Sequence, residues 1–527
     1  MTPPNYHEDF SQDITVSLRY ESPEVEQLPF PPLPPGAGFV SRMPATPPDT
    51  SPVSRIPTAL LHADPVVRTN NIEVPPQLTP LSAPPPPVEE HAEKEENANE
   101  RLLVFSDGII AFALTVAAIT IKIPATVEQL EANSSSIVLR SFMYIVAFII
   151  VANAWVDHHT VFHYIKRNTT AFVVLNFFYL SAIVMFPIGL FFLEFGTELT
   201  AVSDTVSTEQ ILLGLGIFLG SQIIAGLALC AMWIHAKQKN RLLAEGLDPR
   251  LISYMTRRLL SKPTLFIFLT IMAFLALYIP VVALPVIVIA LVAREIYFHR
   301  IRRKLDLTVG TGDTKRIQLF SDAVIGIAIT LSVAQIEFPS LGEDSKNALE
   351  AVNNQWPLLH AFLVGIVIMG AYWLFHYHLF HQVKRHDSWL VFLNCFFLLA
   401  IALMLIPVNW LVNYYHVPGM GAYLFFGLYQ MMTSLILVVM WRHVTHKRRL
   451  LADNVTAQRS RQYGIVVVAQ PLIFLALTIF AGFVPGIGPS IYIALYFVLL
   501  GIVWFFAQGG VQEIGKHFHV RVEGKAH

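Results

Sequence analysis

One apolar stretch occurs twice in this chain, and the duplication constrains the fold more than any other feature. It runs from Arg101 to Pro124 as RLLVFSDGIIAFALTVAAITIKIP, and again from Arg316 to Pro339 as RIQLFSDAVIGIAITLSVAQIEFP. Both copies have an arginine, three residues, Phe-Ser-Asp, and then an almost uncharged apolar run with a threonine at the same offset. Self-similarity of this length at a fixed offset indicates a structural repeat.

Each copy carries an aspartate, Asp107 or Asp322, about two turns inside a segment that is otherwise mostly apolar. A charge in a membrane segment costs several kcal/mol unless it is paired or faces a polar interior. The two aspartates are therefore the first candidates for a functional site.

Composition points to the membrane. The chain is 54% hydrophobic and only 14% charged, whereas a soluble domain carries about 25% charged residues. Runs of roughly 20 apolar residues, long enough to cross a bilayer, follow one another from Arg101 onward. The expected fold class is an all-α polytopic membrane protein. Cys230 and Cys395 lie in apolar runs and show neither disulfide nor metal-ligand spacing.

We expect twelve transmembrane helices with short connections between them. The first six are predicted near residues 102–123, 137–164, 169–194, 209–236, 264–282 and 284–301. The second six are predicted near residues 317–338, 355–382, 387–413, 420–444, 464–484 and 488–509.

The similarity between the halves extends beyond their first helices. Residues 153–167 align with 371–385, and residues 233–243 align with 441–451. The alignment superposes Trp155 on Trp373, His158 on His376, Asn176 on Asn394, and Pro263 on Pro471. One six-helix unit has been duplicated, giving a first repeat at 99–308 and a second at 309–510.

Lysine and arginine in the loops set the expected orientation. Basic groups lie on one side of the predicted membrane, at Lys166, Arg167, Lys237, Arg257, Arg258, Arg300–Lys304, Lys384, Arg385 and Lys447–Arg449, and acidic or neutral loops lie on the other. Both termini are then cytosolic. Because six is even, the repeats enter the membrane the same way round. Two equivalent first helices do not enclose a pore, so we expect a homodimer with a pseudo-fourfold axis.

The ends of the chain have a different composition. Residues 1–98 hold 21 of the 34 prolines, and we predict a disordered, proline-rich cytosolic tail. No basic segment followed by an apolar core opens the chain, so no cleavable signal peptide is expected. The proline tracts could dock a cytosolic partner domain lined with aromatic residues, or the tail could be inert. Residues 511–527 are expected to form a cytosolic C-terminal tail.

The paired Arg-x3-Phe-Ser-Asp signature, the Trp-x2-His in each second helix and the two-by-six layout resemble the transmembrane protein 175 family of endosomal/lysosomal potassium channels. The resemblance spans about residues 101–510. It implies a dimeric, potassium-permeable leak channel of endosomes and lysosomes (or the vacuole) that also conducts protons. It implies no enzyme activity, cofactor, metal or nucleic-acid partner. Consistently, the chain has no TVGYG-like filter loop.

The resemblance also implies where the pore is narrowest. In animal members an isoleucine five residues after the motif aspartate forms the narrowest ring. The matching residues here are Ile327 and, as a departure, Phe112. The further candidates for lining the pore are Thr115, Val116, Ile119, Thr330, Leu331 and Ala334. For each of these, packing against a neighbouring helix is the alternative. Where the family can have serine, this chain has Ala111 and Gly326.

We predict that the other motif residues form a buried polar network within each repeat, because aspartate accepts the hydrogens that arginine, indole and imidazole donate. The residues are Arg101, Phe105, Ser106, Asp107, Trp155 and His158 in the first repeat, and Arg316, Phe320, Ser321, Asp322, Trp373 and His376 in the second. Alternatively, the aspartates face a watery cytosolic vestibule and attract cations.

Other interpretations compete with this one. His158, His159, His163, His376, His378 and His381 cluster on the second helices, where they could modulate gating with pH or, with few carboxylates nearby, hold a metal. A secondary transporter would need interrupted helices with ionisable groups at mid-membrane, and a membrane enzyme would need a nucleophile and base at depth; neither pattern is present. The main alternative is a proton-selective or non-conducting relative.

Overall fold

The computed structural model describes the backbone of residues 87–121, 123–124, 126–199, 206–238, 242–244, 246–275, 280–305, 314–335, 356–448, 450–484 and 486–508. Most of the predicted N-terminal tail and the predicted tail at 511–527 lie outside these residues. The described residues form helices and two isolated bridges, without named strands.

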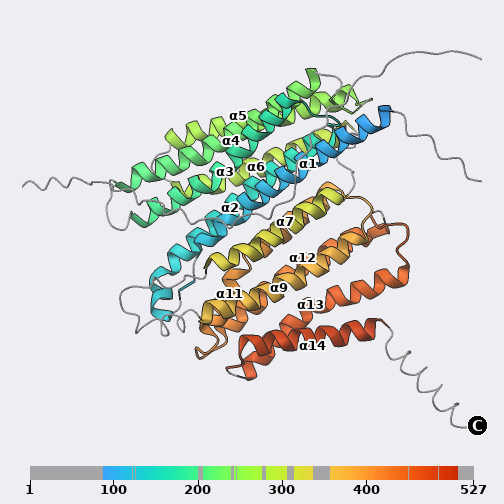
Figure 1. Ribbon diagram of the computed structural model, residues 1–527. Helices are drawn as coiled ribbons and strands as arrows, with labels where there is room; N and C mark the ends of the chain where they lie inside the picture. The colour runs from blue at the N-terminus through green and yellow to red at the C-terminus, as the bar shows by residue number, and fades with distance from the viewer. Residues whose placement is uncertain are drawn as a thin grey trace, which may run out of the picture. The chain divides into compact units, whose positions relative to one another are not determined.

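The helices follow the predicted order (Figure 1). The first repeat contains α1 (Pro87–Val116) with η1 (Ala117–Thr120), α2 (Val127–His163), α3 (Thr170–Leu199), α4 (Val206–Gln238), α5 (Pro249–Leu275) and α6 (Pro280–Lys304). The second contains α7 (Lys315–Leu331) with η2 (Ser332–Gln335), α9 (Trp356–His381), α10 (Ser388–Ala402), α11 (Leu405–Tyr414), α12 (Gly421–Thr445), η4 (His446–Arg448), α13 (Ala457–Phe483) and α14 (Pro489–Ala507).

The expectation of an all-α polytopic membrane protein is confirmed. Among the described residues, nine helical segments are long and apolar enough to cross a membrane, with α10 and α11 together making one of them. Apolar side chains exposed along these segments, such as Phe177 and Val498, are the surface that lipid requires.

Several helix boundaries differ from the prediction; α2, for example, begins at Val127 rather than near 137. The first helix begins at Pro87, inside the segment assigned to the tail, because EEHAEKEENANE is rich in strong helix formers. The fifth begins at Pro249 rather than near 264, since its first turns carry basic side chains that interrupt the apolar run but not the helix. The predicted helix 387–413 is broken between Ala402 and Leu405. Pro407 lies just after this break and has no N–H to donate to the carbonyl of Leu403.

The two repeats are built alike in detail. The second and fourth helices of each repeat end in the same backbone bridge: Lys166 N–H donates to Leu242 O at 2.9 Å in the first, and Lys384 N–H donates to Leu450 O at 2.9 Å in the second. Helix α1 packs on α2 and α3 as α7 packs on α9 and α10. The duplication seen in the sequence is therefore a duplication of structure.

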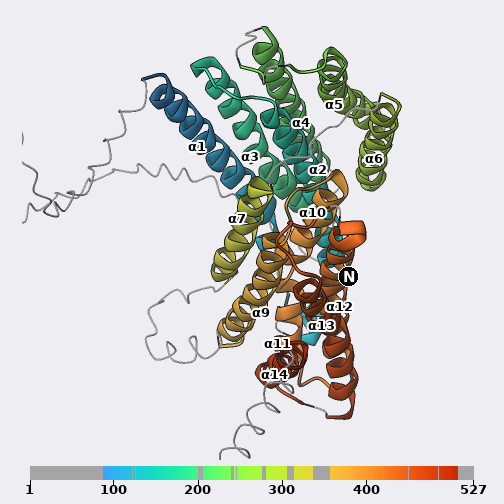
Figure 2. The same cartoon turned by 90° about the vertical axis from the view of Figure 1, so that its right-hand side faces the viewer.

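Helices α1 and α7 lie side by side and run in the same direction (Figures 1 and 2). Near their N-terminal ends, Lys315 forms an ion pair with Glu100. Towards their C-terminal ends, Thr115 and Ile119 line one cavity together with Leu331. The two repeats are accordingly parallel, as the sequence predicted.

Candidate functional site

The carboxylate of Asp107 is the centre of a buried polar network. Its Oδ1 accepts a hydrogen bond of 3.0 Å from Nε1 of Trp155 on α2. Arg316 of α7 donates to both oxygens, from Nε to Oδ2 at 2.9 Å and from Nη2 to Oδ1 at 2.8 Å. This bidentate geometry is the strongest that the two groups form. A buried charge in the first repeat is therefore neutralised by an arginine of the second.

A second branch leads from the same arginine through three helices. Nη2 of Arg316 lies 2.9 Å from Nδ1 of His158. Because a guanidinium only donates, we assign Nδ1 as the acceptor and place the ring proton on Nε2. That Nε2–H donates to Asn176 Oδ1 at 2.9 Å, and Asn176 Nδ2 donates to Ser106 Oγ at 2.8 Å. Ser106 donates to the carbonyl of Leu102 at 2.7 Å, which ends the chain of donors.

The second repeat contains the same network without the arginine. Nε1 of Trp373 donates to Asp322 Oδ1 at 2.8 Å. His376 Nε2 lies 2.8 Å from Asn394 Oδ1, and Asn394 Nδ2 donates to Ser321 Oγ at 2.8 Å. Asp322 is only half-buried, and within the described residues no cation pairs with it.

Arg316 thus pairs with the first repeat and not within its own. The sequence analysis grouped Arg101 with Asp107, but Arg316 takes that place, and Arg101 is exposed on α1. The physical reason is helical geometry, since six residues separate Arg101 from Asp107 and put them about 120° apart around the axis.

The motif phenylalanines differ in the same way. Phe320 is fully buried and stacks on the indole of Trp155, with ring centroids 3.9 Å apart. Phe105, at the equivalent position, is 54% exposed. Phe320 therefore packs between the repeats, whereas Phe105 faces outward.

The residues predicted to form the constriction lie on open faces of their helices. Phe112 is 44% exposed, and Ile327 is half-buried. Val116 is also half-buried. Ala334 belongs to η2, but its side chain is outside the described set.

The two candidate threonines have different surroundings. Thr115 is buried, and its hydroxyl donates to its own helix, to Ala111 O at 3.0 Å and Phe112 O at 3.2 Å. Thr330 is exposed and donates to Ile327 O at 3.0 Å. Both hydroxyls donate hydrogen bonds to the backbone of their own helices. Of the two side chains, only that of Thr330 is exposed.

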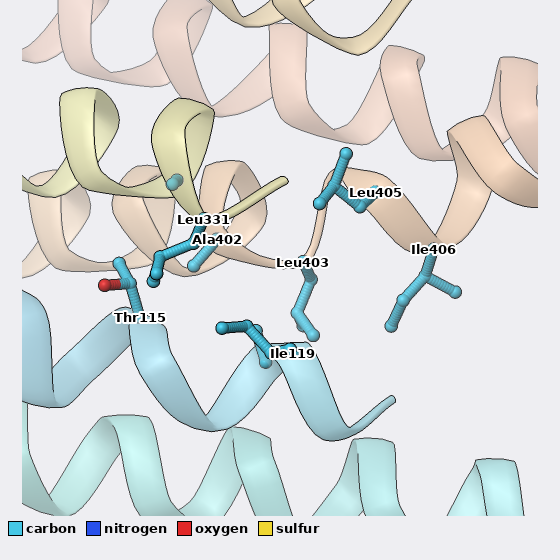
Figure 3. A pocket seen from close by; sticks show the side chains of 9 residues that line it. Thr115, Ile119, Leu331, Ala402, Leu403, Leu405 and Ile406 are labelled. Carbon is cyan, nitrogen blue, oxygen red and sulfur yellow. The ribbon is translucent and has the colours of Figure 1, made fainter. Parts of the chain in front are cut away.

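Three of the pore-lining candidates share a small cavity between the repeats. Thr115, Ile119 and Leu331 converge there with residues on both sides of the α10–α11 break, including Ala402 and Leu405 (Figure 3). This part of the candidate set faces the interior of the chain.

A cluster of charges in the first repeat was not anticipated. Asp157 is buried and accepts from Arg258 at 3.0 Å and Lys262 at 3.1 Å, with Arg294 at 3.7 Å. Glu295 lies 3.0 Å from Arg258. The cluster joins α2, α5 and α6. Basic residues at the start of the fifth helix were its signal in the sequence, but they were assigned to a loop.

The second repeat replaces this cluster with uncharged groups. Phe375 stands where Asp157 stands in the first repeat, and its carbonyl accepts a hydrogen bond of 2.5 Å from Tyr463. The charges are therefore a property of one repeat and not of the shared fold.

Asn176 and Asn394 are the other members that the predicted networks lacked. Their matching offset was visible in the sequence, but only the packing of the third helix against the first shows that each joins a histidine to a serine. Within the described ranges, no three His, Cys, Asp or Glu side chains converge as metal ligands would.

The family model for the endosomal/lysosomal potassium channel TMEM175 matches this chain twice, at residues 101–187 and 316–407. These segments begin at the two motif arginines and cover the first helices of each repeat. A potassium channel of Streptomyces collinus is 30% identical over 152 residues, which are 28% of this chain and 73% of that protein.

Two further relatives are more distant. A potassium channel of Chamaesiphon minutus is 26% identical over 191 residues, 36% of this chain and 90% of that protein. The endosomal/lysosomal proton channel TMEM175 of Danio rerio is 20% identical over 329 residues, 57% of this chain and 61% of that protein.

Among solved structures, the chain is similar to a lysosomal potassium-selective channel TMEM175 homolog from Chamaesiphon minutus, with a TM-score of 0.31, 21% identity, and coverage of 37% of this chain and 97% of that one. The family match in both repeats and the Streptomyces relative decide the assignment. This chain belongs to the TMEM175 family of endosomal/lysosomal potassium channels.

Proposed function

We propose that this protein is a potassium-permeable leak channel of endosomal and lysosomal membranes that also passes protons. The observation that carries the proposal is a row of positions on α1 and α7 that stay open in both repeats. In the proposed dimer, four such rows surround one conduit.

The row contains four pairs of equivalent residues, each exposed or half-buried. The pairs are Val104 with Leu319, Gly108 with Ala323, Phe112 with Ile327, and Val116 with Leu331. They follow one another at four-residue spacing, which forms a single ridge along a helix. A conduit with pseudo-fourfold symmetry needs equivalent residues that are open in both repeats, and these positions satisfy that requirement.

Phe112 and Ile327 are the proposed constriction, because they are the bulkiest pair in the middle of this row. A ring of apolar side chains gates a pore by dewetting, so a small change in its width alters conduction steeply. The Thr115 hydroxyl contributes little in this scheme, since Thr115 is buried and bonds to its own helix.

We further propose that both termini are cytosolic. Bonds between helix ends support this orientation: Lys166 meets the end of α4, and Thr314 at the start of α7 donates to Val383 O at 3.4 Å near the end of α9. These ends carry many of the lysines and arginines. Basic loops stay on the cytoplasmic side of membranes.

The test is current through the purified full-length protein in planar bilayers. Phe112→Ile should raise single-channel conductance several-fold, and Ile327→Phe should lower it by a similar factor. Phe480→Ile is the matched control, because Phe480 is also 44% exposed but lies on the peripheral helix α13. Equal effects of Phe112→Ile and Phe480→Ile would remove Phe112 from the conduit.

Selectivity needs its own measurement, since phenylalanine narrows the ring relative to isoleucine. A proton-selective relative is the second candidate, and its reversal potential would follow the pH gradient and ignore the potassium gradient. A reversal potential that follows potassium supports the first candidate. Uphill flux coupled to a second ion would instead identify a transporter.

A further inference from the structure

The N-terminal turns of α2 contain a motif that the proposed function does not use. Asn133, Ser134 and Ser135 form the sequence Asn-X-Ser, the acceptor motif for N-linked glycans. The chain contains two more motifs of this kind, at Asn168 and Asn454. A motif of three residues often arises by chance, so its place in the fold decides whether it is modified.

Helix α2 is longer than a bilayer requires. Its 37 residues span about 55 Å, whereas the hydrocarbon core is about 30 Å thick. A tilt of about 40°, the upper end of the usual range, still leaves about 42 Å along the membrane normal. Part of α2 therefore lies outside the hydrocarbon core.

The part outside the core is the N-terminal end of α2. The other end stops at His163, and the N–H of Lys166, just beyond it, bonds to Leu242 O after α4. At the N-terminal end, residues 131–135 are all exposed, and all but one are polar or charged. Removing such side chains from water without partners is costly, so these turns face water.

A contact between α1 and α2 gives the height of Asn133 relative to the first motif helix. The hydroxyl of Tyr144 donates to Leu114 O at 2.7 Å, which puts these two residues at about the same level. The helical segment that continues α1 ends at Thr120, about 9 to 12 Å beyond Leu114. Asn133 lies about 16 Å before Tyr144 along α2. It is therefore further from the membrane centre than the end of the first motif helix.

The side chain of Asn133 is exposed, and its amide can carry a substituent. Nδ2 donates to Gln129 O at 2.8 Å, one turn earlier on the same helix. A primary amide has two hydrogens, so an amide that bears a glycan keeps one N–H for this bond. The next two side chains, Ser134 and Ser135, are exposed as well. A glycan at this position leaves the helix and its packing undisturbed.

The other two motifs lie at the opposite ends of the membrane helices. Asn168 follows closely on Lys166, beyond the C-terminal end of α2. Asn454 follows Asp453, which pairs with Lys384 beyond the end of α9 in the second repeat. Basic ends of this kind stay in the cytosol, whereas N-linked glycans are added in the lumen of the endoplasmic reticulum.

We infer that Asn133 carries an N-linked glycan on the luminal side of the membrane, and that Asn168 and Asn454 carry none. The inference rests on the proposed function, a channel of endosomal and lysosomal membranes with both termini in the cytosol. In the transfer, Nδ2 forms a bond to the anomeric carbon of an oligosaccharide carried by a lipid diphosphate. The bond from that carbon to the diphosphate oxygen breaks, the lipid diphosphate leaves, and one amide proton is lost.

Digestion with a peptide N-glycosidase tests the site in the full-length protein produced in a eukaryotic cell. The enzyme should shift the protein to higher gel mobility by the mass of one glycan. Asn133→Gln and Ser135→Ala should each abolish the shift, and Ser135→Thr should keep it, because threonine also completes the motif. Ser134→Ala and Asn454→Gln are the matched controls and should keep the shift.

Two results would overturn the inference: no shift in the unsubstituted protein, or a shift that survives Asn133→Gln. Misfolding is excluded as the cause of a lost shift if the melting temperatures of Asn133→Gln and Ser135→Ala, both treated with the glycosidase, match that of the digested parent protein. Ser135→Thr provides the second check, since it changes the same exposed position but restores the motif.

Orientation is measured separately, by protease digestion of an N-terminal epitope tag in sealed microsomes. A tag that is digested from outside, together with no glycan, overturns the inference and keeps the cytosolic termini. A shift abolished by Asn454→Gln but not by Asn133→Gln overturns both. Potassium current through the purified protein tests the channel function independently, because neither the glycan nor the tag is read through conduction.

Discussion

Asp107 and Asp322 occupy the same place in the same motif, yet their surroundings in one chain differ. Asp107 is buried between an indole and a guanidinium, and Asp322 keeps only the indole. The difference arises because the two repeats pack side by side, and each motif helix has the other motif helix on only one of its sides. At the scale of residues, duplication creates identical groups and packing makes them unequal.

This inequality predicts different consequences for two identical substitutions. Asp107→Ala leaves the Arg316 guanidinium buried without its carboxylate and should cost roughly 3–5 kcal/mol of stability. Asp322→Ala removes a half-buried carboxylate whose partner in the described residues is the Trp373 indole, and it should cost much less stability. Elution in detergent, measured by fluorescence before and after heating, gives the melting temperature of each variant. Identical behaviour of the two variants would contradict the prediction.

The charge cluster around Asp157 provides a second prediction. Asp157→Asn leaves Arg258, Lys262 and Arg294 with Glu295 as the remaining carboxylate of the cluster. It should lower the free energy of unfolding by roughly 3–5 kcal/mol, because the cations stay buried without the charge that compensated them. Asp453→Asn, which removes an exposed pair with Lys384, is the control and should leave the melting temperature unchanged. A comparable fall in melting temperature in both variants would show that burial does not decide how much these ion pairs stabilise the protein.

At the scale of elements, close helix contacts fix the repeats. A Cβ on Gly189 of α3 would lie 2.7 Å from the backbone nitrogen of Phe218 on α4 and 3.0 Å from the carbonyl of Gly214. Backbone atoms do not move aside as a flexible side chain does. This glycine therefore sets how closely α3 and α4 approach.

Gly189→Ala should accordingly destabilise the protein by about 1–3 kcal/mol through overpacking. Gly216→Ala on α4 is the matched control, since a Cβ there meets nothing within 4 Å, and alanine favours a helix more than glycine does. Thermal unfolding in detergent measures both. A loss for Gly216→Ala as large as that for Gly189→Ala would refute the contact argument.

At the scale of the whole molecule, polar contacts that differ in burial join the two repeats. Arg316 bonds to buried groups of the first repeat, including His159 O at 3.3 Å. Arg302 at the end of α6 reaches Ser388 of the second repeat at 3.0 Å, but this bond is exposed. The buried hydrogen bonds of Arg316, and not the exposed bond of Arg302, should hold the two repeats together.

Expression of the chain as two pieces, 1–308 and 309–527, tests this. The pieces should copurify, and Arg316→Gln should reduce the recovered partner at least tenfold, since a buried bidentate pair is lost. Arg302→Gln is the control because it removes the exposed bond between the same pieces. If both variants reduce recovery equally, the buried contacts of Arg316 do not hold the repeats together more strongly than the exposed bond of Arg302.

Much of this architecture could be predicted from the residues. Hydropathy located the membrane-spanning helices of the described residues, and the paired motif identified the duplication. Loop charges together with an even helix count predicted parallel repeats, because these signals are local and need no knowledge of packing. The boundaries of α5 and the α10–α11 break were missed, since an amphipathic start and a mid-segment proline are ambiguous in sequence.

The sequence by itself determined that two polar motifs lie in the first helices of duplicated repeats of a membrane protein, and it determined which residue types each motif contains. It could not determine which arginine meets which aspartate, because Arg101 and Arg316 are chemically identical at equivalent positions. Only the packing of α7 against α1 and α2 decided that Arg316 pairs with Asp107. The same packing left Phe105 exposed, buried Thr115 and left Thr330 exposed, because α1 and α7 cover different faces of each other.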